Sequence, residues 1–160
     1  MTAGRSAGHI KLCGTPENVP LRMRSEEPAM LLFRENEPYA ATQLADLRQA
    51  VGWNRMEDCY TDPRLLSFFH IAVYDSGRLI GFIDSVSNAV TDAYIQDLCV
   101  HPDYQGQGIG TALMERIIAE LKKRCLYMIS VVYEEKLRGF YQRFGFFDTC
   151  CGQMQTYESP

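Results

Sequence analysis

The densest group of residues that could do chemistry lies at positions 100–111, which read Val-His-Pro-Asp-Tyr-Gln-Gly-Gln-Gly-Ile-Gly-Thr. Three glycines within five positions leave the main chain bare, so another molecule can approach the backbone closely. An amphipathic run follows at 112–124, and the first N–H groups of a helix have no acceptor within the helix. With the positive end of the helix dipole, these groups form a site suited to a phosphate.

Three kinds of phosphate loop compete for this segment. A Walker loop ends in Gly-Lys-Ser/Thr, and the segment has no Lys. A dinucleotide fingerprint needs Gly-x-Gly-x-x-Gly at the start of a βαβ unit, whereas Gly106, Gly108 and Gly110 alternate. The third pattern is Gln/Arg-x-x-Gly-x-Gly/Ala after a strand that ends in Val-x-Pro. Residues 105–110 match it in full.

On these residues the chain resembles the GCN5-related N-acetyltransferase (GNAT) superfamily, whose acetyl-CoA motif is similar to residues 100–113 almost throughout. A second segment, Gly-Phe-Tyr-Gln-Arg-Phe-Gly-Phe at 139–146, resembles the family's helix-to-strand segment, where a tyrosine precedes Gly-Phe. The order of elements also fits, and the resemblance covers roughly residues 29–157. It implies acetyl-CoA as co-substrate, no metal, and transfer of the acetyl group to an amine.

The resemblance implies two sets of contacts with coenzyme A. Backbone N–H groups of the Gly-rich loop hold the pyrophosphate, and the preceding strand, splayed from its neighbour, pairs with the pantetheine amides. The residues so predicted are Gln105, Gly106, Gln107, Gly108, Ile109, Gly110 and Thr111 in the loop, and Leu98, Cys99 and Val100 in the strand. Many relatives have Asn seven residues before the tyrosine. Glu134 stands there in this chain, and we expect it to act through its backbone or as a helix N-terminal acid.

Acetyl transfer needs a neutral amine, a stabiliser for the oxyanion and an acid for the departing thiolate. By resemblance Tyr141 protonates the sulfur, and packing in the core is the alternative reading. The base is harder to identify, because strand alternation points Asp97 away from Tyr94 and Gln96 unless a bulge re-aims it. We expect the proton to leave through water, or the amine to arrive neutral, and keep Asp97 as the candidate direct base.

The acceptor pocket is expected from two parts of the chain. In relatives the segment between the first two helices lines this pocket, so Trp53 and Tyr60 are substrate-binding candidates, although Trp53 could equally anchor the core. Asp84 and Gln96 are the candidates on the strands. The preferred acceptor is a primary amine of a small molecule. A protein acceptor (Lys or N-terminus) and a non-catalytic acyl-CoA-binding module are the alternatives.

Hydrophobic periodicity predicts the elements that must position these residues. Strands are expected at 29–34, 69–74, 78–86, 93–100, 126–133 and 146–157, and helices at 40–51, 64–68, 112–124 and 134–144. Thr42 or Asn36 is expected to cap the first helix. The run 126–133 is nearly all apolar, as in a strand buried on both faces. The order β-α-α-β-β-β-α-β-α-β predicts an α/β (α+β) fold, a mixed central sheet with helices on both faces.

Composition sets further limits. The 160 residues predict a flexible arm at 1–28 and one N-acetyltransferase domain at 29–160. A formal net charge of −4 argues against nucleic acid and is compatible with a cationic substrate. Six cysteines without Cys-x-x-Cys, and three histidines, make a zinc site unexpected. Without an apolar segment typical of a signal peptide or a membrane span, we expect a cytoplasmic protein with no membrane partner. A homodimer is an expectation by resemblance.

Overall fold

The computed structural model describes residues 31–124 and 126–154. In chain order its elements are β1 (Leu32–Glu35), α1 (Ala41–Ala50), α2 (Glu57–Tyr60), β2 (Phe69–Asp75), β3 (Arg78–Ser87), β4 (Asp92–Val100), a 3-10 turn (Pro102–Tyr104), α3 (Ile109–Lys123), β5 (Met128–Val131), a second 3-10 turn (Glu135–Leu137) and α4 (Arg138–Gln142). The arm predicted at 1–28 lies outside the described residues.

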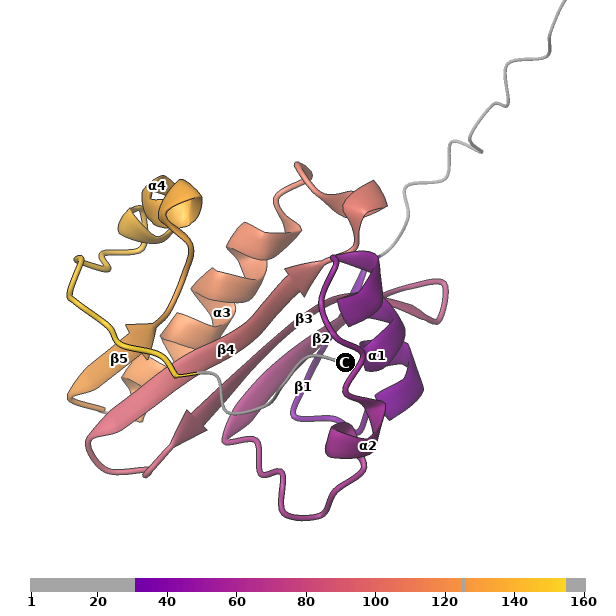
Figure 1. Cartoon of the computed structure of the whole chain (residues 1–160), viewed down its shortest axis with the longest axis horizontal. Coiled ribbons are helices and arrows are strands. Elements are labelled where there is room, and N and C mark those ends of the chain that lie inside the picture. Colours follow the sequence, from indigo (N-terminus) through magenta and orange to yellow (C-terminus); the bar gives the residue numbers. More distant parts are fainter. Residues whose placement is uncertain (1–30, 125, 155–160) are drawn as a thin grey trace, which may run out of the picture.

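The strands form one mixed sheet in the order β1-β2-β3-β4-β5 (Figure 1). Neighbours from β1 to β4 are antiparallel, whereas β4 and β5 are parallel. Ser76 and Gly77, both with positive φ, form the two-residue turn between β2 and β3. The predicted mixed sheet is therefore confirmed.

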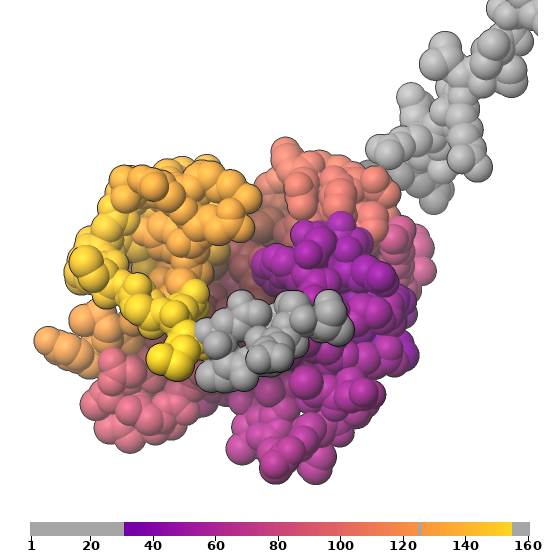
Figure 2. Space-filling view, in the orientation of Figure 1, coloured from indigo at the N-terminus to yellow at the C-terminus, as the bar shows by residue number. Residues whose placement is uncertain are grey.

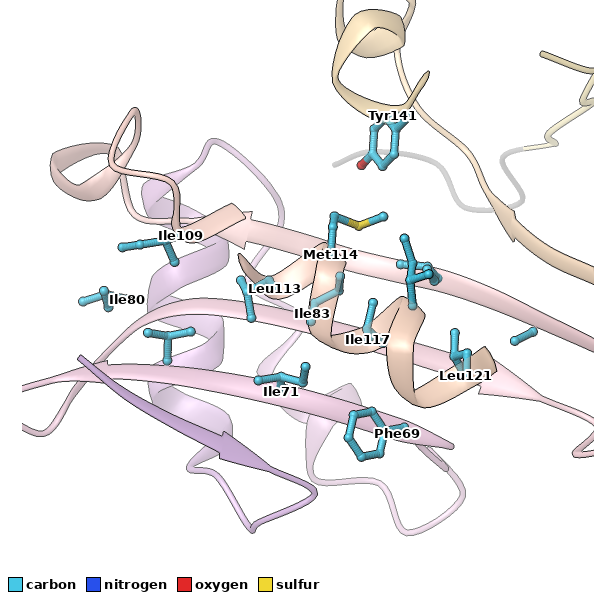
Figure 3. Close-up of a cluster of buried hydrophobic side chains, with 14 residues drawn as sticks. Phe69, Ile71, Ile80, Ile83, Ile109, Leu113, Met114, Ile117, Leu121 and Tyr141 are labelled. Carbon is cyan, nitrogen blue, oxygen red and sulfur yellow. The ribbon is translucent and has the colours of Figure 1, made fainter. Parts of the chain in front are cut away.

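Helices cover both faces of this sheet, as predicted. On one face α3 buries Leu113 and Ile117 against Ile83 and its neighbours (Figure 3). On the other face α1 packs Leu44 against Phe82 in a second, smaller cluster. Each such fully buried side chain contributes roughly 1.5–3 kcal/mol of transfer free energy. The two clusters hold the middle of the sheet rigid between the helices.

The sheet ends at β5, contrary to the prediction. The strand expected at 146–157 does not form over the part that the structure describes, and the remainder lies outside it. The segment is held instead by side-chain contacts, such as the Tyr133 hydroxyl donating to Asp148 at 2.6 Å. Among the described residues no further strand lies beside β5, which makes it an edge strand there, and Met128 is 37% exposed rather than buried. The expectation of burial on both faces was therefore wrong.

Two predictions before β2 were also wrong. Residues 64–68 form a loop rather than a helix, because the Asp62 carboxylate accepts hydrogen bonds from the backbone and guanidinium of Arg64. The short helix α2 forms upstream instead. Neither Thr42 nor Asn36 caps α1, which begins without a side-chain cap. The Asn36 side chain accepts a bond from β2 instead.

Candidate active site

Strands β4 and β5 separate halfway along β4. Their parallel pairing ends at Ile95 and Val131, whereas β4 goes on pairing with β3 as far as Val100. Beyond Ile95 the outer edge of β4 therefore has no partner strand within the described residues. An extended ligand arm can pair with such an edge. The splay expected from the resemblance is present.

A cavity of about 390 Å³ opens at this separation. Its walls bring together six residues predicted from the sequence: Trp53, Gln96, Asp97, Leu98, Glu134 and Tyr141. Figure 2 shows this side of the molecule as a hollow between the block that carries α4 and the block that carries α1. Tyr60 and Asp84 lie behind the walls, each bonded to a wall residue. Tyr94 and Tyr133 also line the cavity and add aromatic surface.

A bulge in β4 brings Asp97 onto the face covered by α1. Asp97 has φ 54, and the pairing with β3 shifts register at this point. Ile95 and Leu98 both pack on the α3 side of the sheet, although they are three residues apart. The alternation of side chains between the two faces therefore shifts by one residue at the bulge. The sequence placed Asp97 on the same face as Gln96 only if the strand contained a bulge, and this bulge is present. Leu98, which strict alternation would place on the face of Gln96, lies on the opposite one.

The carboxylate of Asp97 is already bound by two donors. Arg48 Nη1 donates to Oδ1 at 2.5 Å, and the Tyr60 hydroxyl donates to Oδ2 at 2.6 Å. Burial, followed by this hydrogen bond, raises the pKa of Tyr60, so its phenol stays protonated and keeps donating. The Arg48 guanidinium also lies 5.1 Å from the ring centroid of Trp53. Trp53 and Tyr60 thus surround an internal ion pair.

Arg48 is the charged residue of this cavity that sequence reasoning missed. Its position between Asp46 and Gln49 on α1 placed it on the polar, solvent-facing side of that helix. In the structure its side chain is only 10% exposed. No local signal marks it, because its partner Asp97 is distant in the sequence.

Tyr141 reaches the cavity from α4. Its ring is buried and stacks on Tyr133 at a centroid distance of 4.5 Å, and Figure 3 shows it extending toward the sheet. The hydroxyl has no hydrogen-bond partner within the described residues. Every side-chain N or O atom there that lacks a partner is at least partly exposed. The hydroxyl is therefore open to the cavity. Burial, then the nearby Tyr94 and Tyr133, raises the pKa of Tyr141 to about 12, which keeps it a donor at neutral pH.

The Gly-rich loop presents a row of free donors. Within the described residues, the backbone N–H groups of 106–111 have no acceptor. α3 begins at Ile109, and Gly108 (φ 82) precedes it as N-cap. A Cβ atom at Gly106 or Gly108 would meet nothing within 4 Å, so this backbone faces open space. The Ile109 side chain is buried in the core, which leaves only its N–H for a ligand. Such a cradle fits a pyrophosphate.

The glutamines of the loop hold it in shape. Gln105 Nε2 donates to the carbonyl oxygen of Val100 at 2.9 Å and ties the loop to the end of β4. Gln107 Nε2 donates to the carbonyl oxygen of Asp103 at 3.1 Å. Because both amide groups bond within the loop, the backbone is what remains for a bound molecule.

Two other predicted coenzyme-binding residues differ in environment. Cys99 is buried on the α1 face, and burial raises the pKa of its thiol to about 12. It is therefore a neutral, small packing residue. Glu134 lines the cavity, but its carboxylate is largely exposed and pairs with Lys136 at 2.6 Å. Its carboxylate is thus engaged by Lys136, and a contact of its backbone with a ligand stays a prediction.

The model of the acetyltransferase (GNAT) family matches residues 26–146. The chain therefore belongs to the GNAT family of acetyltransferases, as its fold, its split sheet and its glycine-rich loop indicate.

Individual relatives agree with this assignment. A probable acetyltransferase of unknown function from Staphylococcus aureus has a solved structure that superimposes with a TM-score of 0.69 at 26% identity, covering 80% of this chain and 100% of the other. A chloroplastic GCN5-related N-acetyltransferase 1 from Arabidopsis thaliana is 29% identical over 124 residues, 76% of this chain and 63% of the relative. A chloroplastic serotonin N-acetyltransferase 2 from Oryza sativa is 35% identical over 71 residues, 44% of this chain and 36% of the relative. The matched regions thus span less than two thirds of either plant protein.

Proposed function

We propose that the protein transfers the acetyl group of acetyl-CoA to the primary amine of a small molecule, directly, in a complex that holds both substrates. One observation carries the proposal. The separation of β4 from β5 opens a cavity that contains the Tyr141 hydroxyl, and the free N–H groups of 106–111 follow β4 in the chain. These features fit the thioester and the pyrophosphate of one coenzyme A molecule.

In the proposed reaction the amine nitrogen attacks the thioester carbonyl carbon, and the C–S bond then breaks. A backbone N–H near Leu98 or Cys99 stabilises the oxyanion. The departing sulfur takes the proton of Tyr141, which recovers it from solvent. Little covalent chemistry falls to the protein, so positioning of the two substrates supplies much of the rate.

Asp97 is the candidate for direct removal of the amine proton. Its Oδ1 already accepts a hydrogen bond from Arg48, and its Oδ2 accepts one from Tyr60, so both oxygens are engaged within the protein. We therefore assign it first to holding the bulge of β4, with the amine proton leaving to water. Substitution of Asp97 tests whether this residue removes the amine proton directly.

The cavity walls support a small acceptor. Trp53, Tyr94 and Tyr133 provide aromatic surface, and a cationic or aromatic amine packs well on such rings. The name of the rice relative, a serotonin N-acetyltransferase, is in keeping with an amine of this size. A protein acceptor requires an open groove instead, and remains the second candidate.

Two measurements test this proposal. Isothermal titration should show that acetyl-CoA binds, and thiol release should then be followed with aromatic ethylamines, polyamines, aminoglycosides and Lys-containing peptides. We expect release with at least one small amine. Release with peptides alone would replace the small acceptor by a protein. Tight binding with no release for any amine would identify a non-catalytic acyl-CoA-binding module.

The finer expectations on assembly and location are also proposals. The exposed edge of β5 is suited to pairing with a second copy, which supports a homodimer and is tested by sedimentation. No helix in the described ranges is long and apolar enough to cross a membrane. We expect the protein in the cytoplasm, whereas the names of the plant relatives contain the word chloroplastic. Cell fractionation distinguishes the two locations.

A further inference from the structure

Asp84 is a buried acid that the proposed reaction does not use. It lies on β3 directly opposite Gln96 of β4, with only 7% of its surface exposed. Its Oδ2 accepts a hydrogen bond from Gln96 Nε2 at 3.1 Å. Its Oδ1 accepts bonds from the Ser67 hydroxyl at 2.5 Å and the Ser85 backbone N–H at 2.7 Å. Each oxygen of this carboxyl group thus has its own donors.

His70 completes the network on the side of Ser67. Its Nε2 lies 2.9 Å from the carbonyl oxygen of Glu37, which can only accept, so Nε2 carries a hydrogen. Its Nδ1 lies 3.2 Å from Ser67 Oγ. Ser67 thus connects His70 to Asp84 Oδ1, while Asp84 Oδ2 accepts from Gln96.

This network fixes which way the Gln96 amide points. When Asp84 is ionised, only the N–H end of the Gln96 amide can bond to Oδ2, so Gln96 Oε1 points away from Asp84. Oε1 has no hydrogen-bond partner within the described residues. Because every side-chain N or O atom there that lacks a partner is at least partly exposed, Oε1 is accessible. Because Gln96 lines the cavity that also holds Tyr141, the free oxygen is available to a molecule bound there.

We propose that Gln96 Oε1 binds the acceptor amine by accepting one of its N–H groups, and that Asp84 is the positioning residue that holds the oxygen toward the cavity. This inference rests on the proposed acetyl transfer and names the group that recognises its acceptor. A carbonyl oxygen accepts from an amine or an ammonium group without taking its proton. The site therefore selects an N–H-bearing nitrogen and leaves deprotonation to another group.

Asp84→Asn provides the sharpest test. Ser67 and Ser85 still require an acceptor, so the new amide places its oxygen toward them and its NH₂ group toward Gln96. The Gln96 amide must then reverse and present NH₂ to the cavity. We expect the KM for the amine to rise about tenfold or more, as for loss of a hydrogen bond to a charged partner. Gln96→Leu should raise the KM in the same way and leave the Kd for acetyl-CoA near wild type, while its melting temperature falls because the buried Oδ2 of Asp84 loses its donor.

The double variant Asp84→Asn with Gln96→Glu exchanges the amide and the carboxylate. The new amide can donate to one oxygen of the new carboxylate, and the other oxygen faces the cavity. We expect this exchange to recover most of the amine affinity lost in Asp84→Asn. Ser67→Ala is the matched control, because it removes a donor from Oδ1 and leaves the bond between Gln96 and Oδ2. Its KM for the amine should change by less than about twofold.

Each outcome bears on the inference. An unchanged amine KM in both Gln96→Leu and Asp84→Asn would overturn it. So would a double variant that binds acetyl-CoA and melts normally, yet shows no recovery. Failure of the proposed function looks different, because wild-type protein would then release no thiol with any amine. Titration with acetyl-CoA shows that each variant is folded, and Gln96→Leu alters a partly exposed side chain that a folded protein tolerates.

Discussion

Arg48 and Asp97 form an ion pair inside the protein that joins α1 to the bulge of β4. Their charged atoms are 2.5 Å apart, and the two side chains are only 10% and 21% exposed. The bulge lies where β4 has left β5, so the pair holds the strand in the shape that opens the cavity. A bond between residues 49 positions apart thus sets the geometry of the site.

Arg48→Leu should destabilise the fold. Removing the cation leaves the carboxylate of Asp97 partly buried with no opposite charge, which costs about 3 kcal/mol. Urea unfolding measures the change. Arg64→Leu is the control, because it breaks a similarly short but exposed pair with Asp62, and should leave the stability close to wild type. Equal losses in the two variants would contradict a structural role for the internal pair.

Asp97→Asn separates a structural role from a role as base. The amide keeps the shape of the side chain but loses its charge. Because both oxygens are already bonded, we expect kcat to fall by no more than about tenfold, with the pH profile keeping its acid limb. A direct base should cost roughly 10²–10⁴-fold and abolish that limb. The pH dependence of kcat/KM for the amine decides between them.

Gly108→Val tests the cradle for the pyrophosphate. Gly108 has φ 82, which a β-branched residue adopts only with strain of about 1–2 kcal/mol. Gly77→Val carries the same strain at φ 83 in the β2–β3 turn, a turn that is not part of the loop. We expect both variants to lose similar stability, but only Gly108→Val to weaken acetyl-CoA binding, by about tenfold or more. Equal acetyl-CoA affinity in the two variants would remove the loop from the site.

Cys99 should be unreactive toward iodoacetamide in the native protein. Burial raises the pKa of its thiol to about 12, so almost no thiolate exists at neutral pH. Cys59, Cys150 and Cys151 are exposed and should be labelled in the same sample. Peptide mass spectrometry reads out each site. Rapid labelling of Cys99, with loss of turnover, would instead point to a thiol that takes part in transfer.

The sequence predicts most of what depends on neighbouring residues. Alternating glycines followed by an amphipathic run were enough to predict a glycine-rich turn followed by α3, and hairpin and strand patterns were enough for the mixed sheet. Several of the failures depend on partners far away in the chain. The strand predicted from residue 146 onward needed backbone hydrogen bonds with β5, and over the described residues it does not form them.

The same reasoning explains the errors around the site. The direction of Asp97 is set by a register shift between β3 and β4, which strict alternation along one strand cannot contain. The burial of Arg48 depends on Asp97, so helix periodicity assigned it to solvent. The prediction that Gln96 and Asp84 serve the acceptor came from their strands alone. Their bond emerged only when the register set them opposite each other.

Thiol release by Tyr141→Phe tests the central claim most directly. The Tyr141 hydroxyl has no partner within the described residues and a pKa raised to about 12, so its loss should leave folding and acetyl-CoA affinity intact. With an amine that the wild type acetylates, we predict that kcat falls by roughly 10²-fold, as expected for removal of a general acid. Turnover unchanged by this substitution would contradict the assignment of Tyr141 as the acid in acetyl transfer.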